Sequence, residues 1–122
     1  MLGKKILVVD DEPNIVRPLT YILNKEGFDV STAEDGEQAM TMIRGSKPDL
    51  LILDVMMPNK NGYDVCHEVK SDPELREIHV LMLTAKGQEG DREFGLSKGA
   101  DEYFSKPFSP KMVLNRVKEL LG

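Results

Sequence analysis

The sequence lacks the features that mark secreted, membrane-spanning and nucleic-acid-binding proteins. Its single cysteine, Cys66, excludes an intramolecular disulfide and suits a reducing cytosol. No apolar run is long enough to cross a bilayer, and the N-terminus has no secretory signal, so we expect a cytoplasmic protein without membrane contact. Basic residues are not in excess: 16 Lys and Arg against 21 Asp and Glu give a net charge of −5, which argues against direct nucleic-acid contact.

Internal repeats, low-complexity tracts and linkers are also absent from the sequence. The 122 residues are of single-domain length, and 40% hydrophobic with 30% charged residues is an ordinary composition for a globular protein with one core. We therefore predict a single domain over residues 1–122.

Short apolar runs that end in polar residues recur along the chain. The runs at 6–9, 50–53 and 80–83 are continuous, which is typical of strands buried on both faces. Weaker strands are predicted over 28–32 and 101–105, and helices over 13–26, 36–44, 63–71, 90–97 and 110–121. Because strands that alternate with helices pair in parallel, the predicted fold class is α/β: a doubly wound five-stranded parallel sheet of order 2-1-3-4-5 with helices on both faces, as in flavodoxin/CheY-like folds.

Two helix starts carry recognisable capping residues. Asp35, with Gln38 three residues later, resembles a capping box. Ser109, followed by Pro110, is the expected cap of the last helix.

Acidic residues end the first and third predicted strands. Asp10 and Asp11 follow the first strand, and Asp54 closes the third. In the predicted order these strands are neighbours, and a crevice opens at their carboxyl ends. Three carboxylates in one crevice would raise each other's pKa unless a cation lay among them. Oxygen ligands with room for water favour Mg²⁺.

A hydroxyl and an ammonium group end the fourth and fifth predicted strands at the same edge of the sheet. Thr84 closes the fourth strand and Lys106 follows the fifth. A carboxylate nucleophile, a metal, a hydroxyl donor and a lysine are the groups that phosphoryl transfer requires. We hypothesise that Asp54 is phosphorylated in a Mg²⁺-dependent reaction that yields an aspartyl phosphate.

Each of these residues has a simpler interpretation when it is taken alone. An acid at a strand end is often a turn residue or a cap, a lone threonine there is often a helix cap, and Lys106 could be a solvated loop charge. The joint placement of acids, hydroxyl and lysine at one sheet edge is what favours the site.

The same residues resemble the receiver domain of two-component response regulators. The similarity covers about residues 4–121 and is carried by Asp10-Asp11, Asp54 within Leu-Asp-Val-Met-Met-Pro, Gly62, Thr84-Ala85 and Lys106-Pro107-Phe108. It implies a phospho-accepting switch in which a sensor histidine kinase phosphorylates Asp54. It also implies Mg²⁺ held by Asp11, Asp54 and the backbone carbonyl of Met56, with Asp10 acting through water.

The resemblance also implies roles in switching and phosphoryl lifetime. Thr84 and Lys106 would contact the phosphoryl group, and Tyr103 matches an aromatic switch position that turns inward as Thr84 moves. Met56 and Lys86 occupy positions that tune dephosphorylation. Because Met56 offers no polar group to orient water, we expect slow self-dephosphorylation. As a signalling domain, the protein would promote only its own phosphoryl transfer and dephosphorylation and would not be an enzyme.

The output face implied by the resemblance comprises the 90–97 helix, the 101–105 strand and the 110–121 helix. It looks most like the DNA-binding transcription-regulator branch, which forms homodimers through charge pairs. The matching residues are Arg92, Asp101, Glu102 and Arg116, while Met112 stands where that branch usually has glutamate. The chain could be a stand-alone regulator or the receiver of a larger protein whose effector domain or other partner it controls.

Two other functions remain open on this evidence. A phosphatase of the haloacid dehalogenase type would place its nucleophile on the first strand with an acid two residues later, and Asp10 and Glu12 fit that spacing poorly because Pro13 follows. A flavin-binding protein would need a hydroxyl- and glycine-rich phosphate loop, whereas the first loop here is anionic.

Overall fold

The computed structural model describes residues 3–57, 59–84 and 99–122. Its sheet is parallel and has the order β2-β1-β3-β4-β5, as predicted. The strands are β1 (Lys5–Val9), β2 (Asp29–Ala33), β3 (Leu50–Asp54), β4 (His79–Thr84) and β5 (Glu102–Ser105). The helices among the described residues are α1 (Pro13–Lys25), α2 (Gly36–Gly45), α3 (Gly62–Ser71) and α5 (Pro110–Leu121). The helix predicted over 90–97 lies outside the described residues.

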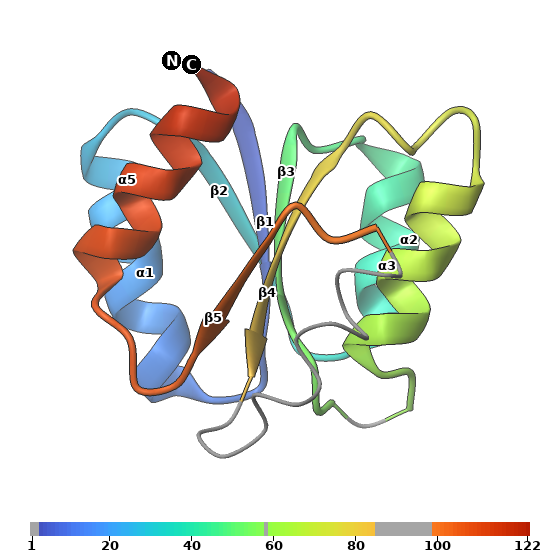
Figure 1. Ribbon diagram of the computed structural model, residues 1–122, viewed down its shortest axis with the longest axis horizontal. Coiled ribbons are helices and arrows are strands. Elements are labelled where there is room, and N and C mark those ends of the chain that lie inside the picture. Colours follow the sequence, from blue (N-terminus) through green and yellow to red (C-terminus); the bar gives the residue numbers. More distant parts are fainter. Residues whose placement is uncertain (1–2, 58, 85–98) are drawn as a thin grey trace.

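Helices cover both faces of the sheet, with α1 and α5 on one face and α2 and α3 on the other (Figure 1). The side chains of the central strands alternate between the two layers: Val8 and Ile52 pack toward α1 and α5, whereas Leu51 and Leu53 pack toward α2 and α3. Continuous apolar strands arise because both faces are covered. The weaker strand β2 lies at the edge of the sheet, in agreement with its polar sequence.

The helix caps follow the predicted pattern only in part. As in a capping box, Asp35 Oδ1 accepts a hydrogen bond from Gln38 N at 2.8 Å. The return bond differs, because Gln38 Oε1 accepts from the backbone amide of Glu34 at 2.8 Å and not from that of Asp35. Ser109 occupies the N-cap position of α5 without a side-chain capping bond. The amide of Met112 already donates to the Ser109 carbonyl at 3.0 Å, and Pro110 has no N–H to offer.

Within the described part of the chain, no helix combines the length and apolar character needed to span a membrane.

Candidate functional site

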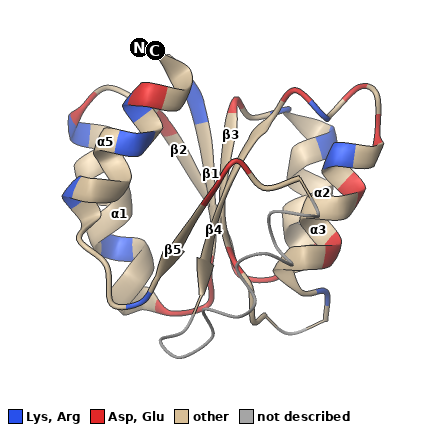
Figure 2. Ribbon diagram, viewed as in Figure 1, with Lys and Arg blue, Asp and Glu red and all other residues tan. Residues whose placement is uncertain are grey.

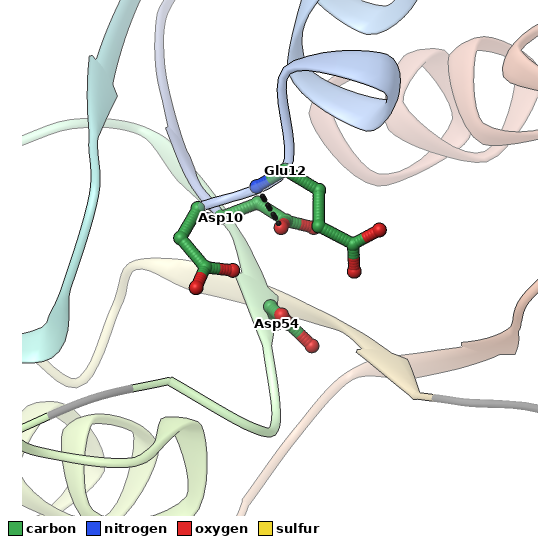
Figure 3. Close-up of side chains that lie close together, drawn as sticks. Asp10, Glu12 and Asp54 are labelled. Atoms are coloured by element: carbon green, nitrogen blue, oxygen red, sulfur yellow. Dashed lines mark hydrogen bonds between the residues drawn. The ribbon is translucent and has the colours of Figure 1, made fainter.

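The predicted site residues meet at the carboxyl edge of the sheet. Asp10 directly follows β1, Asp54 and Thr84 are the last residues of β3 and β4, and Lys106 directly follows β5. Asp10, Asp54 and Thr84 are buried, with only 2%, 4% and 0% of their surface exposed. The close-up shows Asp10, Glu12 and Asp54 converging from the end of β1 and the end of β3 (Figure 3). The ends of β1, β3, β4 and β5 thus bring these residues together at one edge of the sheet.

Short backbone contacts fix the two buried acids. Asp10 Oδ1 accepts a hydrogen bond from Glu12 N at 2.9 Å, and Asp54 Oδ1 accepts one from Met56 N at 3.3 Å. Each carboxylate thus folds over the turn that follows its own strand. Gly62 closes on the same turn from α3: a Cβ at this position would lie 2.4 Å from the Asp54 carbonyl oxygen. A side chain at residue 62 would therefore push β3 and α3 apart beside the site.

The positively charged ammonium of Lys106 lies close to three carboxylates. Its Nζ lies 3.0 Å from Glu12 Oε1, 3.3 Å from Asp10 Oδ2 and 3.6 Å from Asp54 Oδ2. The backbone amide of Lys106 donates to the Thr84 carbonyl at 2.6 Å, which continues the pairing of β5 with β4 up to the lysine. Acidic residues after β1 and a basic stretch after β5 lie at this same edge in Figure 2. The position of Lys106 next to the acids therefore follows from the pairing of β5 with β4.

The electrostatic environment favours protonation of the buried acids. Burial and, to a smaller extent, the charge of Asp10 raise the pKa of Asp54 to about 6, because Lys106 and the Met56 amide only partly offset them. The pKa of Asp10 is also raised, again mainly by burial. We expected repulsion between carboxylates to dominate, but loss of hydration contributes more because both side chains lie beneath the surface. Burial lowers the pKa of Lys106, yet its hydrogen bond to Glu12 and the charges of Asp54 and Asp10 outweigh that, so its pKa is raised.

The acids form a set of oxygen donors that fits a small divalent cation. Carboxylate oxygens of Asp10, Asp11, Glu12 and Asp54 all lie within 4.8 Å of one another. Among the described residues, the buried Oδ2 of Asp10 has no hydrogen-bond partner, although the Lys106 ammonium is nearby. Hard oxygen ligands of this kind, with an acceptor left over, suit Mg²⁺. Glu12 was not predicted as part of the cluster, although its position directly after Asp11 was the signal that could have found it.

The structure describes two of the residues predicted to affect switching and phosphoryl lifetime, Met56 and Tyr103. Met56 is 63% exposed, so its side chain leaves the edge of the site open to water. Tyr103 is buried, and its hydroxyl lies 3.3 Å from that of Tyr63 on α3. The inward orientation predicted for the switched state is therefore already present here. Lys86 lies outside the described residues.

The predicted dimer residues that the structure describes make their contacts within the chain. Asp101 Oδ2 accepts from Val80 N at 2.8 Å and from Lys70 Nζ at 3.3 Å. Glu102 pairs with Arg116, with Oε2 2.9 Å from Nε. Arg92 lies outside the described residues. The charge pairs of the expected output face are thus satisfied intramolecularly in this structure.

Comparison with known proteins gives one consistent result. A family model described as the response regulator receiver domain matches residues 6–118. The chain is 49% identical over 120 residues to the alkaline phosphatase synthesis transcriptional regulatory protein PhoP of Bacillus subtilis, covering 98% of this chain and 49% of that protein. It is 45% identical over 120 residues to the DNA-binding response regulator MtrA of Mycolicibacterium smegmatis, covering 98% and 51% respectively. The chain therefore spans about half the length of the curated relatives it matches.

Solved structures agree with the sequence relatives. A putative response regulator from Chloroflexus aurantiacus superposes with a TM-score of 0.92 at 36% identity, covering 98% of both chains. The chemotaxis response regulator CheY4 of Vibrio cholerae superposes with a TM-score of 0.89 at 29% identity, covering 97% of this chain and 98% of that one. Both comparisons extend over nearly the whole described fold.

Proposed function

Since the chain belongs to the family of response regulator receiver domains, which are phospho-accepting switches of two-component systems, we propose that Asp54 is its phosphoryl acceptor. The observation that carries the proposal is the position of this carboxylate. Asp54 closes the central strand β3, is buried, and lies 3.6 Å from the Lys106 ammonium in the same crevice as Asp10. We propose further that residues 1–122 form one receiver domain.

The chemistry is a transfer of one phosphoryl group from a sensor histidine kinase, since such kinases phosphorylate response regulators. A carboxylate oxygen of Asp54 attacks the phosphorus, the new P–O bond forms, and the P–N bond to the kinase histidine breaks. The leaving imidazole takes up a proton. Lys106 and Thr84 contact the transferred group, whose developing charge their donors stabilise.

Asp54 must be ionised to act as a nucleophile, and its surroundings work against this. Burial raises its pKa to about 6, so a cation near the carboxylates would favour the reactive form. Mg²⁺ would be held by Asp11, Asp54 and the Met56 carbonyl, with Asp10 acting through water. When bound, it supplies charge neutralisation of the phosphoryl oxygens.

Switching follows from the new charge at Asp54. A phosphoryl group adds about two negative charges and strong acceptor oxygens, which draw Thr84 and Lys106 toward it. Tyr103 lies on β5 and packs inward next to Tyr63, so a movement of Thr84 on the adjacent strand β4 is transmitted to the ring. The exposed Met56 cannot orient an attacking water, and the phosphorylated state is correspondingly long-lived.

The proposed output face comprises the helix predicted over 90–97, which lies outside the described residues, together with β5 and α5. It controls a downstream partner or effector domain. Relatives about twice as long as the matched region are named DNA-binding and transcriptional regulators, which supports a DNA-binding effector as the partner that this face controls. The proposed function is that of a cytoplasmic protein. Homodimers would form on phosphorylation if Asp101, Glu102 and Arg116 exchanged their internal partners for those of a second copy. Measuring hydrodynamic size with and without beryllofluoride and Mg²⁺ tests this, since a constant size contradicts dimerisation.

The acceptor assignment is tested by mass spectrometry. We expect the protein to gain one phosphoryl group on Asp54 when it is incubated with acetyl phosphate and Mg²⁺, and the Asp54→Asn variant to gain none. Asp64→Asn, which removes an exposed acid at the start of α3, is the matched control and should react like the wild type. Modification of Asp10 in place of Asp54, or no mass change in the wild type, contradicts the proposal.

A further inference from the structure

The Lys106 ammonium has its shortest contact with a residue that the phosphoryl-transfer chemistry does not use. Nζ donates a hydrogen bond to Glu12 Oε1 at 3.0 Å, whereas the carboxylates of Asp10 and Asp54 lie at ion-pair distances of 3.3 and 3.6 Å. Glu12 and Lys106 are 94 residues apart in sequence, and only the fold brings them together. In this structure the lysine is therefore turned toward Glu12 more than toward the acceptor.

The backbone of Glu12 is fixed while its side chain stays available. Its amide donates to Asp10 Oδ1 at 2.9 Å, and its carbonyl accepts from the amides of Ile15 and Val16 at 2.9 and 3.0 Å. Glu12 is the N-cap residue of α1, yet its side chain makes no capping hydrogen bond. The direction in which the side chain leaves the backbone is thus set by Asp10 and by the first turn of α1, and its carboxylate is left to bind Lys106.

We propose that Glu12 is a positioning residue that holds Lys106 in the unphosphorylated protein and competes with the phosphoryl group for it. The proposal rests on the assignment of Asp54 as the acceptor. Phosphorylation then moves the lysine from Glu12 to the phosphoryl oxygens. Glu12 thereby sets how readily the site accepts a phosphoryl group, without contacting the group itself.

The contact between Glu12 and Lys106 is weak enough to be broken when the phosphoryl group arrives. The Lys106 side chain is 15% exposed and that of Glu12 is 57% exposed, so water competes for the carboxylate. Exposed ion pairs of this kind are weak, so a phosphoryl group with about two negative charges can outcompete Glu12 for the lysine. The Glu12 carboxylate also repels an incoming anion, because its oxygen lies within 4.8 Å of those of Asp10 and Asp54. Both effects act in the same direction.

The first test measures phosphorylation rates at saturating Mg²⁺, with acetyl phosphate as the donor. Because it releases Lys106 and removes one repelling charge, Glu12→Gln should raise the rate constant about two- to tenfold. Glu34→Gln removes one negative charge just beyond β2, next to the same edge, and should stay close to the wild-type rate. Titrating Mg²⁺ for each variant ensures that saturation holds, since Glu12 is also near the proposed ligands.

The second test observes the contact directly, first in the protein without metal or phosphodonor. The Nζ chemical shift of Lys106, recorded by NMR through its Cε protons and assigned with Lys106→Met, should move in Glu12→Gln and stay in place in Glu34→Gln. Glu12→Asp keeps the charge but shortens the side chain by one methylene group, so it should move the shift with a smaller gain in rate. With beryllofluoride and Mg²⁺, the Lys106 shift should become the same in wild type and Glu12→Gln.

The outcomes separate this proposal from the one on which it rests. An unchanged Lys106 shift in Glu12→Gln, or a wild-type rate in that variant, contradicts the proposal that Glu12 holds Lys106. The assignment of Asp54 as the acceptor is not affected by that result. If the wild type is not phosphorylated on Asp54, both proposals are wrong. A rate increase of equal size in Glu34→Gln would show a general charge effect and also overturn the specific role of Glu12.

Discussion

Lys70 and Lys106 are both largely buried among acceptors, yet their surroundings differ in one respect. Lys70 Nζ donates to the carbonyls of Ile78 and Arg76 at 2.6 and 3.2 Å and to Asp101 Oδ2 at 3.3 Å, so each of its three protons has an acceptor. Within residues 3–57, 59–84 and 99–122, Lys106 Nζ makes one hydrogen bond, to the exposed Glu12, and two longer ion pairs, to Asp10 and Asp54. The first lysine ties α3 to the start of β4 and of β5, and the second lies over buried acids.

The number of acceptors close to each ammonium distinguishes Lys70, a structural residue, from Lys106, which lies in the proposed phosphorylation site. The Lys70 ammonium has three acceptors within the fold, so a ligand would add little to its hydrogen bonding. Around Lys106 the pKa values of two acids are raised, and Asp10 Oδ2 has no hydrogen-bond partner among the described residues. Incomplete pairing of buried charges costs stability, and it is found here at the site where we propose that a cation and a phosphoryl group bind.

Replacing Lys70 gives the largest expected effect on stability. Lys70→Met leaves Asp101 and two carbonyls without their donor, so we expect the free energy of unfolding to fall by about 2–4 kcal/mol in urea titrations. Lys118→Met, which breaks an exposed pair with Glu26 between α5 and the end of α1, should lose less than about 1 kcal/mol. Equal losses in the two variants would remove the distinction drawn for Lys70.

Replacing Asp54 should have the opposite sign. The pKa of Asp54 is raised from 3.8 to about 6 in the folded protein, so folding favours the protonated carboxyl. This contribution to the free energy of unfolding is fully present below pH 3.8 and is lost as the pH rises through about 6. At pH 7 without Mg²⁺, Asp54→Asn should therefore be more stable than the wild type by roughly 1–3 kcal/mol, and the difference should shrink toward pH 4. Asp29→Asn, on the exposed edge strand, is the control. If Asp54→Asn were less stable than the wild type at pH 7, the ionised Asp54 carboxylate would not destabilise the folded protein.

A smaller loss is expected at the glycine that packs against Lys70. Gly99 has φ +102, and a Cβ there would lie 2.7 Å from Lys70 Cγ. Gly99→Ala should therefore lower the free energy of unfolding by about 1–2 kcal/mol, because the backbone conformation is unfavourable and the lysine stem must shift. Gly45→Ala at the end of α2 meets open space and should be neutral or slightly stabilising. Thermal or urea unfolding of both variants measures the difference.

The smallest expected effect is kinetic and lies within the site. Met56→Asn places an amide where an exposed methionine now stands, so it can orient a water toward the phosphoryl group on Asp54. We expect the phosphoryl lifetime to shorten a few-fold, equivalent to about 1 kcal/mol or less in the barrier. Met112→Asn, an equally accessible methionine replaced on α5, should leave the lifetime unchanged. An unaltered lifetime in Met56→Asn would show that this side chain does not set it.

The sequence was sufficient for the sheet order and for the residues at its carboxyl edge. Asp54 could be identified because a buried strand that ends in an acid is a local pattern, and Asp10, Thr84 and Lys106 each follow a strand in the same way. Glu12 could not be identified, since its role depends on a partner 94 residues away. Ser109 was assigned the right position but the wrong interaction, because the competing backbone bond from Met112 is a matter of local geometry.

Alternation of apolar runs with helical segments by itself determined that this chain forms a doubly wound sheet with its acids at one edge, because burial on two faces and parallel pairing follow from residue type and order. Only the tertiary structure decided which carboxylates lose their hydration, which lysine is fully paired and which is not, and that Tyr103 lies inward against Tyr63. Those properties depend on distances between elements far apart in sequence, and such distances are set by how the helices and strands pack together.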